Sequence, residues 1–167
     1  MVMKSDVIGA WALVSWEQKR GEVTGYPMGE SPVGSIVYTD DGLLSVNIMR
    51  RDRPQMVTGD FVTATAAEKA LAFEGYLSYF GRYEVMEDRI VHRILACSYP
   101  NWAGQEQFRF PAWDGDLLIL NAPERDVNGT KVSASITWRR WRNTMPDGDQ
   151  VTGVRKVTAN AGASTPG

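Results

Sequence analysis

The chain has 167 residues, of which 43% are hydrophobic and 10% aromatic, and this predicts a single domain with a sizeable core. Its 18 basic and 20 acidic residues give a net charge of −2, so a nucleic-acid partner is not expected. One cysteine excludes a disulfide framework, and without a long apolar run we expect no membrane span and no signal peptide, hence a cytoplasmic protein.

The first part of the chain predicts three strands. Residues 9–18 form a strand whose two faces are both mostly apolar, and the glycines and prolines of residues 21–32 predict a loop. Residues 34–38 and 43–49 favour β structure and flank an Asp-Gly pair, which is a strong hairpin signal. The pattern leaves open which face of the second hairpin strand points inward. A polar loop over residues 50–63 follows.

One helix is predicted. Thr65 and Glu68 have the spacing of a capping box, and residues 68–79 are rich in helix-forming residues. Gly75 weakens this helix, so we expect it to end near Tyr76. Three residues at helical spacing predict a stripe that faces the core: Ala70, Phe73 and Leu77.

The central stretch, residues 81–109, holds the only histidine and the only cysteine. It predicts three consecutive strands at residues 82–86, 89–97 and 105–110, separated by polar turns. By alternation, the second strand has Ile90, His92 and Ile94 on one face, and the third has Gln105, Gln107 and Arg109 on one face.

The last part of the chain continues as hairpins. Asp114-Gly115 joins residues 108–113 to 117–120, and Asn128-Gly129 precedes a long strand at 131–141. Residues 150–158 predict a short strand, and the small polar residues 159–167 predict a disordered tail. About eight strands and one short helix predict an all-β domain over residues 1–158, a single antiparallel up-and-down barrel, with an open sandwich as the alternative.

Five separated blocks carry a resemblance over residues 9–141: GAWALVSWE, PMGESPVGSIVYTDDGLLSV, AFEGYLSYFGRYEV, IVHRILACSYPNWAGQEQFR and TWRRW. In this order they resemble the bacterial and fungal lipocalin-like domain family. The resemblance implies a lipocalin-like barrel around an apolar pocket, with Trp11 plugging one end beneath Arg139 or Arg140. Where the family pattern often has a second histidine, this chain has Arg93, which argues against a two-histidine mechanism.

The resemblance implies small-molecule binders or tailoring proteins of natural-product pathways, and related domains act as cyclases or isomerases. The favoured hypothesis is a cofactor-independent cyclase or isomerase that binds an apolar, aromatic or polyketide-like molecule and orients it. The alternative is a non-catalytic carrier of a small hydrophobic ligand. A third hypothesis, an interaction module with a filled barrel, predicts no cavity.

His92 is the predicted base, because its pKa in water lies near neutrality and burial in the barrel would favour the neutral form. Arg109 and Tyr83 are expected to polarise a ligand oxygen, although each of the three could instead be structural or exposed. The predicted ligand-binding residues, each of which could also be plain core, are Trp16, Tyr38, Met49, Tyr79, Trp102, Phe108 and Trp138. No metal and no cofactor are implied, and we expect a monomer or homodimer.

Overall fold

The structure, a computed structural model, describes residues 1–142. The strand expected at residues 150–158 and the tail expected at 159–167 lie outside the described residues, as does the end of the expected 1–158 domain.

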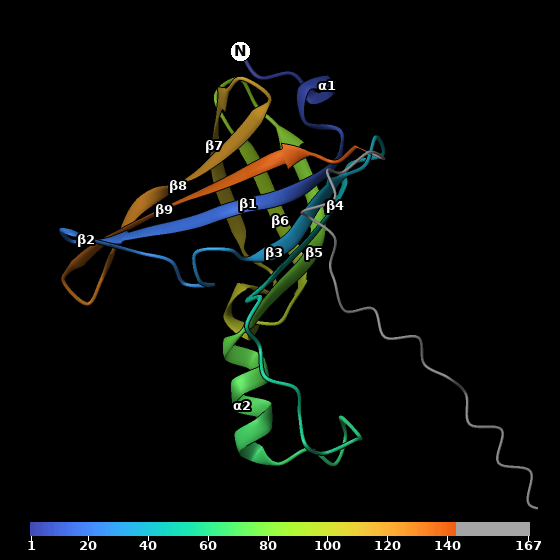
Figure 1. The fold of residues 1–167 in the computed structure, drawn as a ribbon. Helices are drawn as coiled ribbons and strands as arrows, with labels where there is room; N and C mark the ends of the chain where they lie inside the picture. Colours follow the sequence, from blue (N-terminus) through green and yellow to red (C-terminus); the bar gives the residue numbers. More distant parts are fainter. Residues whose placement is uncertain (143–167) are drawn as a thin grey trace, which may run out of the picture.

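Within residues 1–142, nine antiparallel strands form one sheet that closes on itself (Figure 1). Neighbours in sequence are neighbours in the sheet from β3 onward, and β1 pairs with both β3 and β9, which closes an eight-stranded barrel. The short β2 is an extra strand that pairs with the far end of β1. The predicted antiparallel barrel is therefore confirmed. The strands are β1 (Gly9–Arg20), β2 (Val23–Gly25), β3 (Val33–Tyr38), β4 (Leu43–Met49), β5 (Tyr76–Val85), β6 (Ile90–Cys97), β7 (Glu106–Asp114), β8 (Leu117–Val127) and β9 (Thr130–Arg140).

The tight turns form where the sequence places residues that tolerate a left-handed backbone. Gly42 joins β3 to β4 with φ of 88°, and Asn128 and Gly129 join β8 to β9 with φ of 52° and 78°. Two consecutive residues with positive φ match the right-handed twist of the flanking strands. Both hairpins were predicted from these residues and are confirmed.

Alternation along each strand decides which side chains face the interior of the barrel. In β4, Leu44, Val46 and Ile48 are almost completely buried, whereas the alternating set Ser45, Asn47 and Met49 lies on the outer face. In β6, Ile90, His92 and Ile94 face the interior, and Val91 is also buried. In β7, Arg109 faces the interior.

Helix α2 (Ala66–Glu74) begins at the predicted cap, where Thr65 and Glu68 bond reciprocally. It ends at Glu74, within two residues of the expected end near Tyr76, but the predicted core-facing stripe is wrong. The helix does not continue beyond Gly75 because Tyr76 starts β5, where it pairs with Met49. No residue of α2 is buried, and Leu77, expected on its stripe, belongs to the sheet.

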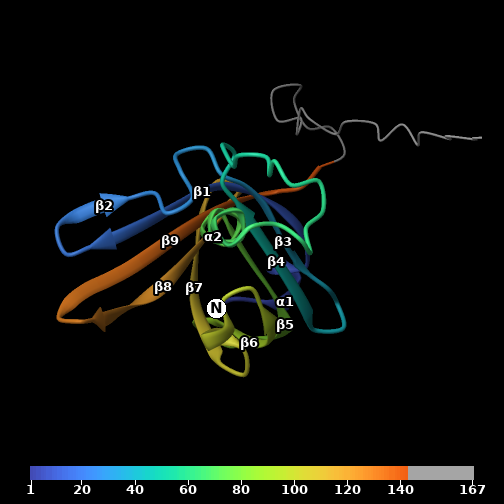
Figure 2. The same ribbon diagram turned by 90° about the horizontal axis from the view of Figure 1, so that it is seen from below.

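The two ends of the barrel differ (Figures 1 and 2). A one-turn helix that was not predicted, α1 (Lys4–Val7), lies at one end, while α2 and the short 3-10 helix η1 (Pro100–Trp102) lie at the other. In residues 1–142, neither α-helix combines the length and the apolar character that crossing a bilayer requires.

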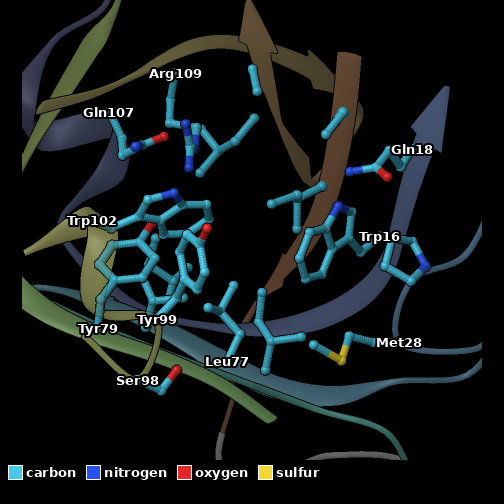
Figure 3. Close-up of a pocket in the computed structure, with 18 of the residues that line it drawn as sticks. Trp16, Gln18, Met28, Leu77, Tyr79, Ser98, Tyr99, Trp102, Gln107 and Arg109 are labelled. Atoms are coloured by element: carbon cyan, nitrogen blue, oxygen red, sulfur yellow. The ribbon is translucent and has the colours of Figure 1, made fainter. Parts of the chain in front are cut away.

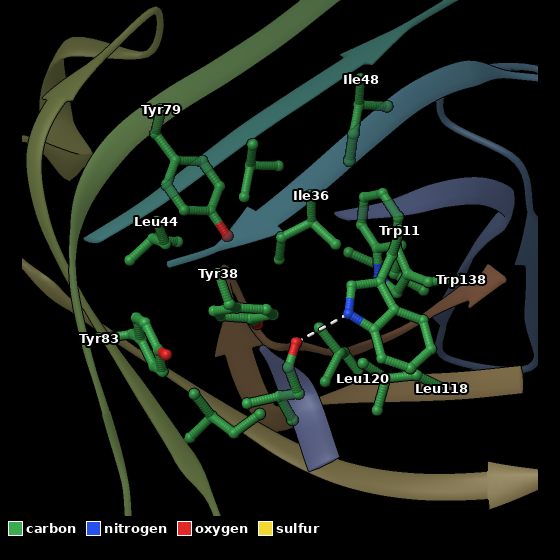
Figure 4. Packing of buried hydrophobic residues seen from close by; sticks show 14 of the residues in the cluster. Trp11, Ile36, Tyr38, Leu44, Ile48, Tyr79, Tyr83, Leu118, Leu120 and Trp138 are labelled. Atoms are coloured by element: carbon green, nitrogen blue, oxygen red, sulfur yellow. Dashed lines mark hydrogen bonds between the residues drawn. The ribbon is translucent and has the colours of Figure 1, made fainter. Parts of the chain in front are cut away.

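At the α1 end, the side chain of Trp11 is almost fully buried and its indole N–H donates to the carbonyl of Val7 at 2.8 Å (Figure 4). The guanidinium of Arg140 lies 4.1 Å from the Trp11 ring and donates to the carbonyls of Asp6 and Ile8. Of the two arginines that the resemblance allowed, Arg140 is therefore the one that stacks on Trp11.

Candidate functional site

Half of the barrel is filled and half is hollow. Packed aromatic and aliphatic side chains fill the α1 half, among them Trp11, Tyr38, Tyr83, Leu44 and Leu118 (Figure 4). The half near α2 and η1 encloses a cavity of about 470 Å³. The hypothesis of a filled barrel without a cavity is therefore wrong.

The wall of the cavity is mostly apolar. Strand residues that face the interior make up most of its surface, including Ile36, Val46, Ile48, Leu77, Leu120 and Ile136. Indole rings add to it from three elements: Trp16 of β1, Trp102 of η1 and Trp138 of β9. All three tryptophans were predicted as ligand-binding residues, and the structure brings them together around one space.

A few polar groups interrupt this wall (Figure 3). Gln107 and Arg109 of β7 lie on one side, and Trp16 and Gln18 of β1 lie across from them. The indole N–H groups of Trp16 and Trp138 are buried and have no hydrogen-bond partner within residues 1–142. An unmet buried donor costs about 1 to 3 kcal/mol, so the wall as described is short of acceptors.

His92 lies beside the cavity but does not line it. The side chain is fully buried, its Nε2 is 2.7 Å from the hydroxyl oxygen of Tyr38, and its Nδ1 is 2.9 Å from that of Tyr79. Burial, and secondly the charge of Arg109, hold the pKa of His92 well below its ordinary value, so the ring is neutral. Of the two tyrosines, only Tyr79 lines the cavity, so His92 connects to it through that hydroxyl.

Tyr83 and Tyr38 belong to the filled half of the barrel. The hydroxyl of Tyr83 donates to the backbone carbonyl of Thr39 at 2.7 Å, and its ring meets that of Tyr38 edge-on at 4.8 Å between centroids. Neither lines the cavity. The structure therefore places these two predicted residues behind the cavity, as packing, rather than in its wall.

Two further predicted residues contribute little or nothing to the cavity wall. Met49 lies on the outer face of β4 and is not part of the wall. Phe108 borders the cavity, but it is 37% exposed and its ring lies 5.9 Å from the guanidinium of Arg89 on the outside of the barrel. Both strands have apolar residues on both faces, so composition could not separate inside from outside.

Arg109 is 5% exposed and lines the cavity from β7. One of its N–H groups donates to the carbonyl of Phe108 at 2.8 Å, and no carboxylate lies within 4.0 Å of it among the described residues. Burial raises the pKa of Tyr79, and the nearby Arg109 charge opposes this. Arg109, Tyr79 and His92 thus form one connected group at the wall.

The wall also contains residues that the sequence did not single out. Ser98, Tyr99, Gln18 and Gln107 line the cavity. Gln107 shares a face with Arg109 and could have been found from that alternation. Tyr99 lies in the turn after β6, and the centroid of its ring is 5.7 Å from that of Trp102. The alternation of a strand does not extend into a turn, so it could not predict this position.

Comparisons with known proteins agree with this architecture. A family model described as a lipocalin-like domain matches residues 8–141. The chain is also similar to a protein of Aspergillus oryzae (strain ATCC 42149 / RIB 40) named 4'-hydroxy-3'-methoxypropiophenone carrier protein ppsC, with 33% identity over 106 residues. That match covers 58% of this chain and 96% of the relative.

Proposed function

Because the chain belongs to the lipocalin-like domain family, we propose that it is a non-catalytic carrier of a small aromatic molecule that it holds inside the barrel. The observation that carries this proposal is the cavity of about 470 Å³ with a mostly apolar wall. Cavities of roughly 300 to 1,000 Å³ with a few polar groups are typical of small-molecule sites. The relative named as a carrier of an aromatic ketone supports the same function.

The wall favours a flat ligand with oxygen acceptors. Trp16, Trp102 and Trp138 present aromatic surface on which a ring can pack. The polar groups of the wall include more donors than acceptors, among them Arg109 and the unpaired indole N–H groups. A ligand carbonyl, phenol or ether oxygen would supply what the wall lacks. An aromatic ketone combines both features.

The cyclase or isomerase that the sequence favoured requires a group that can move a proton to or from the ligand. His92 was the predicted base, but both of its nitrogens bond to tyrosines and its side chain does not line the cavity. Tyr83, predicted to polarise a ligand oxygen, donates to Thr39 instead. These placements favour binding without chemistry.

Calorimetric titration with 4'-hydroxy-3'-methoxypropiophenone tests the proposal. We expect binding of one molecule per chain, weaker binding of cyclohexyl ethyl ketone because it lacks the aromatic ring, and quenching of tryptophan fluorescence by the aromatic ligand. Mass spectrometry of the ligand after prolonged incubation separates the two functions: recovery unchanged supports a carrier, and a time-dependent change in structure would support an enzyme.

A matched pair of variants locates the site. Ala134 lines the cavity, so Ala134→Phe should fill part of it and weaken binding at least tenfold. Ala112 is exposed on β7 and is not part of the wall, so Ala112→Phe should bind as the unmodified chain does. Equal affinities in the two variants would place the ligand elsewhere.

A further inference from the structure

Arg109 is a buried positive charge without a negative partner in the described part of the chain. It is one of two buried polar or charged side chains there, the other being the neutral His92. Of its five N–H groups, one is bonded to the carbonyl of Phe108. A guanidinium does not lose its proton in proteins, so burying it unpaired is costly. A partner that enters the cavity from outside would remove that cost.

The groups around Arg109 cannot supply the missing charge. From β3, β5 and β6 the nearest titratable side chains are Tyr38, Tyr79 and His92, and all three are neutral near pH 7, because burial raises the pKa of each tyrosine and lowers that of the histidine. On β7 itself, Glu106 bonds to Arg93 at 2.8 Å and is exposed. The remaining charged wall residues are Glu74, after which α2 ends, and Arg125 of β8, and both are exposed. Cys97 of β6 is a half-buried free cysteine that does not line the cavity.

His92 also decides which way the Tyr79 hydroxyl points. The Tyr38 hydroxyl is buried and its one hydrogen-bond partner within residues 1–142 is His92 Nε2, so Tyr38 must donate to that nitrogen or leave its own hydrogen unpaired. The ring is neutral, so Nδ1 then carries the ring hydrogen and donates to the oxygen of Tyr79. The hydrogen of Tyr79 is left free to point into the cavity.

We propose that Arg109 and the Tyr79 hydroxyl form an anion-binding subsite in the cavity, which holds one ionised oxygen of the ligand, either a phenolate or a carboxylate. This inference rests on the proposed function, since it names the chemical class of the carried ligand and the part of the ligand that lies beside Arg109. In a site with little water, such an oxygen is stabilised by a charge-assisted hydrogen bond from a guanidinium and by a second hydrogen bond from a hydroxyl. His92 is a positioning residue, because it acts on the ligand through Tyr79.

The test uses 4-hydroxyacetophenone and 4-methoxyacetophenone, which differ in that only the first can ionise. Absorbance reports the ionisation, because the phenolate absorbs at longer wavelength than the phenol. We expect the bound phenol to ionise at least one pH unit below the free phenol, which corresponds to tenfold tighter binding of the anion than of the neutral form. The affinity for the methyl ether should not change with pH.

Variants assign the effect to its residues. Arg109→Gln should abolish the shift in ionisation, Arg109→Lys should retain part of it, and Tyr79→Phe should reduce it while the ether still binds. The comparison of phenol with ether in the unmodified protein stands even if a variant does not fold. 4-Acetylbenzoate and 4-acetylbenzamide form the second arm: preference for the benzoate over the phenolate assigns the oxygen to a carboxylate, and the reverse assigns it to a phenol.

The outcomes separate this inference from the proposed function. If the phenol and its ether bind equally at every pH and the bound phenol stays neutral, and the benzoate binds no better than the benzamide, the anion subsite is refuted while the carrier function stands. If the bound phenol ionises at lower pH, or the benzoate binds better than the benzamide, but mass spectrometry shows that the ligand is altered, the anion subsite stands and the carrier function is refuted. If none of the four probes binds, both are refuted for aromatic ketones.

Discussion

The burial of His92 makes the free energy of unfolding depend on pH in a window where no other side chain of ordinary pKa titrates. Burial, and then the Arg109 charge, lower the pKa of His92 well below 6.5, its value in an unfolded chain. Below about pH 6.5 the unfolded chain therefore binds a proton that the folded chain does not, so the free energy of unfolding falls as the pH falls. Above that pH both states are unprotonated and the effect vanishes.

The magnitude follows from a single proton. The chain has one histidine, so the slope of the free energy of unfolding against pH approaches about 1.4 kcal/mol per pH unit, and the loss between pH 7.5 and 5.0 reaches about 2 kcal/mol. Carboxylates with ordinary pKa values titrate near pH 4 and contribute little in this window. Five acids have lowered pKa values, and the stability that they contribute is lost mainly as the pH falls through about 4, where carboxyls of the unfolded chain take up protons. They are Asp41, Asp52, Asp60, Glu68 and Asp88.

Urea unfolding at half-unit steps from pH 7.5 to 5.0 measures this slope. His92→Gln is the control, because glutamine keeps a donor and an acceptor for the two tyrosines but does not titrate, and its curve should be flat in the window. In the NMR spectrum of the folded protein, the single imidazole should not titrate near pH 6.5, because its pKa is lowered well below that value. A flat curve for the unmodified protein, or the same slope in both proteins, would refute the reasoning that His92 is buried in its neutral form.

Two further predictions concern the frame of the barrel. Arg140→Ala should lower the free energy of unfolding by about 2 to 3 kcal/mol, because it removes the stack on Trp11 and two hydrogen bonds to backbone carbonyls. Arg139→Ala is the control and should change that free energy by less than about 0.5 kcal/mol, because Arg139 is exposed. Equal effects of the two variants in thermal unfolding would contradict the assignment of the stack to Arg140. Gly81→Ala should lower the free energy of unfolding by more than about 2 kcal/mol, since a Cβ there would overlap the backbone of β6 at the bulge. Gly25→Ala is the control and should be nearly neutral, because there is open space around Gly25. Chemical denaturation of both variants measures the difference, and a tolerated Gly81→Ala would show that β5 and β6 can separate there.

Much of the barrel could be predicted because its signals are local. Asp-Gly and Asn-Gly pairs place the hairpins, since the residues that tolerate positive φ are few. Period-two alternation placed Ile90, His92 and Ile94 on one face and placed Gln107 on the same face as Arg109, but it left open which face points inward. The structure places both sets inside the barrel. The core-facing stripe of the helix was wrong because Leu77 belongs to β5 and pairs with Ile48 of β4, a partner that no local pattern contains.

The residues of the predicted site lie at different depths along the barrel axis, and the alternation of side chains along a strand does not predict depth. Tyr38 and Tyr79 face the same interior, yet one is packed in the filled half and the other lines the cavity. Alternation gives the direction of a side chain but not its depth, and depth depends on how the strands are staggered around the barrel. Met49 lies outside the cavity wall for a different reason: β4 has apolar residues on both faces, and Met49 is on the outer one.

The sequence by itself determined a meander of antiparallel strands, its tight turns and an interior rich in apolar side chains, because these depend on neighbours a few residues apart. Tertiary structure decided that Arg140 rather than Arg139 covers Trp11, and that His92 is enclosed by Tyr38, 54 residues away, on one side and Tyr79 on the other. The stack of Arg140 on Trp11 forms only when the first and last strands pair. Tyr38 and His92 lie on β3 and β6, which are not neighbours in the sheet, so their contact depends on how the whole sheet curves. No pattern of residues close in sequence contains either pair.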